Sequence, residues 1–339
     1  MLFKKRVGIL MIFILSVVFL SGTAGAKTYE WRLGSIFPAK SPIGEQMALL
    51  VKKVEQKTNG KMKIKIGYSS AFGGLKELVP ALSMGSIQMF ITGHNWWDTI
   101  DKNRKIFTFP YTFSDWDHLT AFIKSSSWQD MLKKLDAQNT HMIFPDAKAE
   151  KVVLWKRGPN RVLLSKKPVF TAKDLEGLKL RLYESELAKR VWRHMGCNIT
   201  VVAWAEAYLA LKQGMVEAIT APRNLCYGMK FYEVAPYITD INEFLQAECV
   251  VVNKPAWEKL PPNIKKAIMV SITEVATKAN ENLYSRAEAD LKKMMDEGAF
   301  YIRTSLKSFK KKILPLAKEL ESEGMWRKGL FDEIQQLKK

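Results

Sequence analysis

The chain has 339 residues, enough for about two domains, and its 47% hydrophobic and 26% charged residues are ordinary for a globular protein. This composition excludes a chain too poor in apolar residues to bury a core. The formal net charge is +19, but the lysines are scattered and form no dense basic arm. We therefore expect no nucleic-acid partner, and we attribute to the charge an attraction for small anions.

The first 26 residues have the pattern of a secretory signal peptide. Lys4, Lys5 and Arg6 form a basic start, residues 7–20 are apolar, and Ala24-Gly25-Ala26 fits a cleavage site. The apolar run is shorter than the roughly 20 residues that cross a bilayer. We predict cleavage after Ala26 and release into the periplasm. Loss of the three basic residues lowers the net charge from +19 to +16.

The N-terminal half alternates between predicted strands and helices, as α/β proteins do. Ser41 and Pro42 are predicted to open the first helix, and Asn59-Gly60 to end it. Ser114 is predicted to cap a later helix. The strands are expected at 29–33, 62–68, 87–92, 141–144 and 151–156, with helices from 42 to 58, from 75 to 84 and after 114.

The C-terminal half continues this alternation and then changes character. Strands are expected at 162–165, 178–182, 199–202, 216–220, 249–252 and 300–302, with helices after Ser185, around Tyr208 and at the C-terminus. Between Pro262 and Glu297, apolar residues keep helical spacing for about 50 Å. A helix of that length exceeds one small domain, so we expect it to brace two.

One predicted strand carries an arginine at the place where α/β proteins bind ligands. In the strand 178–182, Leu178, Leu180 and Leu182 alternate with polar residues, so Arg181 lies on the polar face near the strand's carboxyl end. Ligands of open α/β sheets bind at these ends. An arginine there is suited to a carboxylate, which it grips through two parallel hydrogen bonds.

The stretch from Thr171 to Tyr237 resembles the DctP-type substrate-binding proteins of TRAP (tripartite ATP-independent periplasmic) transporters. The family pattern runs DL-x-G-L-K-x-R, then E-x-Y-x-AL-x-x-G-x-VD, then K-x-YEV. The matching residues are Asp174, Leu175, Gly177, Leu178, Lys179, Arg181, Glu206, Tyr208, Ala210, Leu211, Gly214, Val216, Lys230, Tyr232, Glu233 and Val234. The resemblance extends more loosely over almost the whole mature chain.

The resemblance implies a two-lobe α/β fold of the periplasmic binding protein type, with hinge strands and a long helix spanning both lobes. Lobe I would comprise residues 27–153 plus 246–285, and lobe II residues 154–245 plus 286–339. The chain would be a monomeric, non-enzymatic subunit that captures a small organic acid and delivers it to the small and large integral membrane subunits. The alternatives are a binding protein serving a sensor or another transporter class, and a secreted α/β enzyme.

The resemblance also assigns the candidate ligand site. Arg181 matches the family arginine that salt-bridges the ligand carboxylate, and Arg161 resembles a second cleft arginine. Ala221 stands where many members have an asparagine, so the site should be less polar than theirs. Glu184 would bind a ligand hydroxyl or amine, or pair with Arg181. The other candidates are aromatic walls or strand-end polar residues: Phe72, Asn95, Trp96, Trp97, Tyr111, Tyr183, Trp204, Thr220 and Tyr227.

Signals for other chemistry are missing from the sequence. No zinc-type histidine pair, nucleophile elbow, phosphate loop or dinucleotide fingerprint occurs, so we predict no metal and no cofactor. Cys197, Cys226 and Cys249 leave at least one thiol unpaired in a monomer. The sequence allows one disulfide or three free cysteines.

Overall fold

The computed structural model describes residues 27–338, so the predicted signal peptide lies outside the described residues. The strands are β1 (Tyr29–Gly34), β2 (Met62–Gly67), β3 (Met89–Gly93), β4 (Thr140–Phe144), β5 (Trp155–Lys156), β6 (Arg161–Ser165), β7 (Lys179–Leu182), β8 (Asn198–Val201), β9 (Ala218–Pro222), β10 (Tyr237–Asp240), β11 (Ala247–Asn253) and β12 (Phe300–Arg303).

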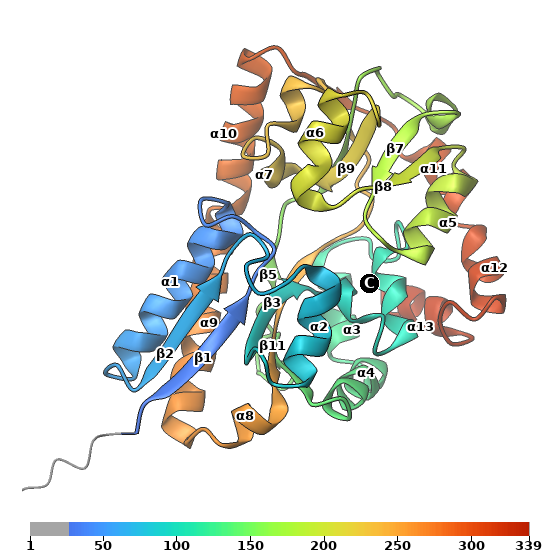
Figure 1. Cartoon of the computed structure of the whole chain (residues 1–339). Helices are drawn as coiled ribbons and strands as arrows, with labels where there is room; N and C mark the ends of the chain where they lie inside the picture. Colours follow the sequence, from blue (N-terminus) through green and yellow to red (C-terminus); the bar gives the residue numbers. More distant parts are fainter. Residues whose placement is uncertain (1–26, 339) are drawn as a thin grey trace, which may run out of the picture.

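Helices cover both sheets (Figure 1). The α-helices are α1 (Pro42–Lys57), α2 (Leu75–Ser83), α3 (Trp116–Ile123), α4 (Ser126–Asp136), α5 (Glu186–His194), α6 (Ala207–Lys212), α7 (Arg223–Cys226), α8 (Lys254–Glu258), α9 (Pro262–Glu281), α10 (Leu283–Asp296), α11 (Lys307–Ile313), α12 (Leu316–Ser322) and α13 (Leu330–Gln336). The 3-10 helices are η1 (His94–Trp97), η2 (Lys102–Thr108), η3 (Ala172–Leu175), η4 (Trp204–Glu206) and η5 (Phe231–Glu233).

The first sheet has the strand order β2-β1-β3-β11-β4, and β5 pairs with β11 at its edge. β1 is parallel to β2 and β3, whereas β11 is antiparallel to β3 and β4. β11 follows β6 to β10 of the second sheet in the sequence, so the chain returns to the first sheet at β11. Apolar residues of α1, which is capped by Ser41, cover this sheet together with α9.

The second sheet has the order β12-β10-β6-β9-β7-β8, and β7 is parallel to β8 and β9. Figure 1 shows this sheet in a separate lobe, beside α6, α7 and α10. The sequence analysis did not predict β10 or α4. Two adjacent strands connect the lobes: β5 pairs with β11 through Lys156–Ala247 and Trp155–Glu248. β5 falls just inside the range predicted for lobe II, although it pairs in the first sheet.

The long helix was predicted as one element, and the structure divides it into α9 and α10 at Asn282. The Asn282 amide donates to the carbonyl of Lys278, 3.3 Å away, and the Ser285 hydroxyl donates to the Asn282 carbonyl, also at 3.3 Å. Such side-chain bonds compete with the helical backbone ladder. α9 packs on α1 and α10 on α7, so the pair still bridges both lobes, as Figure 1 shows.

The C-terminal tail also differs from the single helix that we predicted, because it forms α11, α12 and α13. α13 lies against lobe I: the Gln335 amide donates to the carbonyl of Thr112 at 2.7 Å, and His118 Nε2 lies 2.6 Å from the carbonyl oxygen of Ile334.

The cap predicted for α3 differs by one residue, because Asp115, and not Ser114, caps this helix. The three cysteines are buried and unpaired.

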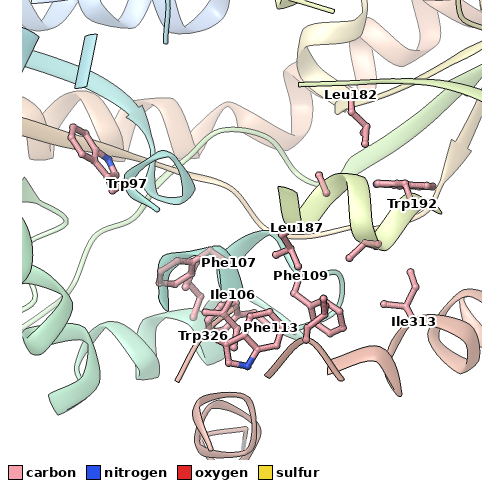
Figure 2. Packing of buried hydrophobic residues seen from close by; sticks show 14 of the residues in the cluster. Trp97, Ile106, Phe107, Phe109, Phe113, Leu182, Leu187, Trp192, Ile313 and Trp326 are labelled. Atoms are coloured by element: carbon pink, nitrogen blue, oxygen red, sulfur yellow. The ribbon is translucent and has the colours of Figure 1, made fainter. Parts of the chain in front are cut away.

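An apolar cluster crosses from one lobe to the other beside α5. Figure 2 shows Phe109 and Ile106 of the first lobe near Leu187 and Trp192 of α5, with Trp326 and Ile313 from the tail completing the group. Each of these side chains is at most 3% exposed. The lobes are therefore in direct apolar contact on this side of the molecule.

Candidate functional site

A cavity of about 400 Å³ lies between the two lobes, within the usual size of small-molecule sites. Its walls come mainly from segments that follow the carboxyl ends of β1, β2, β3, β7 and β8, as expected for α/β sheets. The lining residues are Ile36, Phe37, Ser70, Gly74, Leu75, Lys76, Glu77, Trp96, Arg157, Arg161, Arg181, Tyr183, Glu184, Val201, Val202, Ala203, Trp204, Ala205, Thr220, Pro222, Leu225 and Gln246.

Arg181 is the least neutralised of the three buried guanidinium groups in this cavity. Its residue is 3% exposed, and its Nε donates to the carbonyl of Val202 at 2.8 Å. Its guanidinium carbon lies 5.5 Å from the ring centroid of Trp204. Among the residues that the structure describes, no carboxylate lies within ion-pair distance of Arg181. Burial, with a smaller effect from Arg161, lowers the pKa of Arg181 to about 10.

The other two arginines of the cavity have carboxylate partners. Arg157 forms two bonds with Glu248, of which Nη2–Oε2 is 2.6 Å. Arg161 donates from Nε to Glu243 at 3.0 Å and from Nη1 to Gln246 at 3.1 Å. Its Nη2 donates to the hydroxyl of Thr220 at 3.0 Å and to the carbonyl of that residue at 3.2 Å. These two guanidinium groups are thus held and largely neutralised.

Aromatic side chains close one side of the cavity. The rings of Trp96, which follows β3, and Tyr183, which follows β7, meet edge to face with centroids 4.6 Å apart. They come from different lobes, so the pair bridges the cleft. The indole nitrogens of Trp96 and Trp204 are buried without an acceptor in the described chain. Burial raises the pKa of the Tyr183 hydroxyl, so this group remains protonated.

The structure brings seven of the twelve predicted residues to the cavity wall: Arg161, Arg181, Tyr183, Glu184, Trp96, Trp204 and Thr220. Glu184 pairs with Lys189 at 2.9 Å, and not with Arg181. The predicted residues Phe72, Trp97, Tyr111 and Tyr227 do not line the cavity. Asn95 lies beside Trp96 in η1, and its side chain is not among those described.

Three of the four residues away from the wall have a structural setting of their own. Trp97 is fully buried in the core, edge to face with Phe90. The hydroxyl of Tyr111 donates to the carbonyl of Ile241 at 3.1 Å. Tyr227 stacks on Tyr232 in the second lobe. The position of an aromatic residue after a strand end therefore does not predict whether its side chain faces the cleft or the core.

The sequence analysis missed Arg157, Gln246, Phe37 and Leu75 as wall residues. One feature of the sequence could have indicated a partner for Arg157. Glu248 precedes the apolar run of its strand, and a buried carboxylate needs a cation beside it. Phe37 stacks under the Arg157 guanidinium with the centroid 5.2 Å from its carbon. No comparable signal exists for Gln246, because its role depends on a residue 85 positions earlier in the chain.

Between residues 27 and 338, the structure groups no set of three or more His, Cys, Asp or Glu side chains suited to a metal ion. Over the same residues, no helix combines the length and apolar character needed to cross a membrane.

Comparison with known proteins yields consistent matches. Residues 33–323 match the family model described as bacterial extracellular solute-binding protein, family 7 (DctP). A solute-binding protein of Chromohalobacter salexigens is 26% identical over 330 residues, covering 96% of this chain and 94% of that protein. The C4-dicarboxylate-binding periplasmic protein DctP of Rhodobacter capsulatus is 25% identical over 281 residues, covering 82% and 81% of the two chains.

A solved structure confirms the predicted two-lobe fold. It is a TRAP periplasmic solute-binding protein from Chromohalobacter salexigens with bound D-glucuronate, and it superposes with a TM-score of 0.81. The match covers 91% of this chain and 100% of that one at 22% identity.

Proposed function

The chain belongs to the DctP family of bacterial extracellular solute-binding proteins, and on that premise we propose that it is the periplasmic receptor of a TRAP transporter for a small organic acid. The observation that supports this most directly is Arg181, a buried guanidinium that faces a cleft without a carboxylate partner in the described chain. A ligand carboxylate would supply that partner.

The proposed contacts follow from the cavity wall. Arg181 would bind the ligand carboxylate, and Arg161, held by Glu243 and Thr220, would contribute a second donor face. Trp96, Tyr183 and Trp204 would cover the ligand body. Glu184, being paired with Lys189, would act at the rim. A contact from Asn95 stays a prediction.

The two lobes would move relative to each other when the ligand binds. We take the predicted lobes as the moving bodies, hinged where β5 and β11 cross together and where α9 meets α10 at Asn282. The receptor would act as a monomer in the periplasm after signal-peptide cleavage. It would present the closed form to the integral membrane subunits and catalyse no reaction.

Substitution of Arg181 tests the proposal. Wild type, Arg181→Ala and Arg193→Ala would be titrated calorimetrically with a panel of monocarboxylates, dicarboxylates and sugar acids. Loss of a buried carboxylate–arginine pair costs about 2–5 kcal/mol, so Arg181→Ala should bind the best acid at least about 30-fold more weakly. Arg193 is exposed on α5, and its removal should leave the affinity unchanged.

Two results would contradict the proposal. If Arg181→Ala binds as tightly as wild type, the assigned site is wrong. If wild type binds no acid of any class, the receptor function itself is wrong.

A further inference from the structure

We propose that this cavity selects an organic acid with one carboxylate and an apolar body, because only one of its three buried guanidinium groups lacks a carboxylate partner among the residues that the structure describes. This inference rests on the proposed function and narrows its substrate class.

The first guanidinium, that of Arg157, is fully compensated. Its side chain is 4% exposed, and that of Glu248 is 0% exposed. The two residues form two parallel hydrogen bonds in the fork geometry that arginine prefers with carboxylates. A second anion at this position would displace the interaction or meet the repulsion of a buried carboxylate.

The second guanidinium, that of Arg161, is compensated in the same way. Its side chain and that of Glu243 are 7% and 5% exposed, with Nε 3.0 Å from Oε2. Its two terminal nitrogens donate to Gln246 and Thr220. Arg161 therefore brings a polarised surface to the cavity but no net charge.

The third guanidinium, that of Arg181, is uncompensated. Only its Nε has a hydrogen-bond partner in the described chain, the carbonyl of Val202. Its two terminal nitrogens remain for a ligand, side by side as a carboxylate requires. The buried wall thus carries one unbalanced positive charge, which one carboxylate neutralises.

A second carboxylate would find no equivalent partner. The other charged residues of the wall, Lys76, Glu77 and Glu184, lie at the rim, and two of these three are acidic. Burying an unpaired carboxylate costs several kcal/mol, so a dicarboxylate should be rejected even when its length fits.

The rest of the wall suits an apolar body. Ile36, Phe37, Leu75, Val202, Pro222 and Leu225 contribute apolar surface from both lobes. The hydroxyl of Thr220 and the Gln246 oxygen, which would serve a sugar hydroxyl, already accept bonds from Arg161. Ala221 is fully buried and offers no side-chain amide. Apart from the indole nitrogens of Trp96 and Trp204, the described wall offers few free polar groups, so a sugar acid with several hydroxyls would lose more hydrogen bonds to water than it gains.

The test compares monocarboxylates with dicarboxylates of similar carbon skeleton and with one sugar acid. Wild type would be titrated with hexanoate and adipate, with phenylacetate and 1,4-phenylenediacetate, and with D-glucuronate. We expect the better monocarboxylate to bind at least about 100-fold more tightly than its matched dicarboxylate, and more tightly than glucuronate. Equal or tighter binding of a dicarboxylate or of glucuronate overturns this inference and leaves the receptor function standing. Binding of none of the acids overturns both.

A charge variant tests the cause. Glu243→Gln keeps the side-chain shape and one acceptor oxygen for Arg161 Nε, at the cost of the bond that Glu243 Oε1 accepts from Trp192 Nε1. It removes the compensating charge, so the cavity gains a second unbalanced cation. The preference for the monocarboxylate should then fall at least about tenfold. Glu150→Gln, at an exposed position outside the cavity wall, removes the same charge and should not change the preference. An unchanged ratio in Glu243→Gln shows that charge counting does not set the selectivity.

Discussion

At the residue scale, the three cavity arginines differ in whether a carboxylate neutralises them, and this decides which of them is available to a ligand anion. Glu248, in β11, neutralises Arg157, and Glu243, just before β11, neutralises Arg161. Arg181 has only a backbone carbonyl and a tryptophan face. Because a buried charge without a counterion is costly, Arg181 is the residue whose environment a bound anion improves most.

His94 gives a prediction at the same scale. Its ring is buried, with Nδ1 3.1 Å from both the amide nitrogen and the carbonyl oxygen of Ala247, and burial lowers its pKa from 6.5 to about 3. Protons therefore bind preferentially to the unfolded chain below pH 6.5. The contribution of neutral His94 to the free energy of unfolding is complete above pH 6.5 and declines as the pH falls toward 3. At about pH 5 the free energy of unfolding should be lower by about 2 kcal/mol.

Urea unfolding at pH 7 and at about pH 5 measures this effect. The free energy of unfolding of His94→Gln should decline less than that of wild type over this interval, by about 2 kcal/mol. His194→Gln controls for removal of a histidine elsewhere. Identical pH dependence in wild type and His94→Gln would show that His94 is not the group responsible.

At the scale of elements, the cleft is closed by short segments that follow strands. η1 carries Trp96 from the end of β3, and the residue after β7 is Tyr183, so two strand ends in different lobes place their rings in contact. An edge-to-face pair contributes about 0.5–1.5 kcal/mol beyond its buried area. This contact exists only when the lobes are together, so it stabilises the closed form.

Replacing Trp96 should therefore speed ligand release. We expect Trp96→Ala to raise the dissociation rate of the tightest acid about tenfold, with a smaller effect on the association rate. Stopped-flow displacement measures both rates. Phe170→Ala, at a residue that is 56% exposed, serves as the aromatic control. An unchanged dissociation rate in Trp96→Ala would show that the contact between Trp96 and Tyr183 does not slow ligand release.

At the scale of the whole molecule, the two sheets lie in separate lobes (Figure 1). The cavity is lined by residues of both lobes. The lobes are joined by the β5–β11 pair, by the α9–α10 junction at Asn282 and by the tail that returns α13 to lobe I. An arrangement of this kind can bend about the crossing segments while each sheet stays rigid.

Ligand-driven closure is measurable by small-angle X-ray scattering. The radius of gyration of wild type should decrease when the tightest acid is added at saturation, because the ligand bridges Arg181 of one lobe to the wall of the other. Arg181→Ala should show no decrease at the same ligand concentration. A radius that is equal with and without ligand in wild type would contradict hinge closure.

Much of the fold could be predicted because its signals are local. Ser41 caps α1, as its position before Pro42 predicted, and the period-two pattern of 62–67 marks β2. Non-local features were missed. β10 was not expected at all, and the break at Asn282 interrupts an apolar pattern that continues through it. A helical pattern reports which face is buried, and not whether one rigid element buries it.

The sequence by itself determined the family, the α/β class, and Arg181 as the residue to test, since these follow from motif order and from side-chain alternation within single strands. Only the tertiary structure decided which strand-end aromatics face the cleft, and that Glu243 and Glu248 neutralise two of the three arginines. The physical reason is that charge compensation depends on distances of about 3 Å between residues 82 and 91 positions apart, which no local pattern encodes.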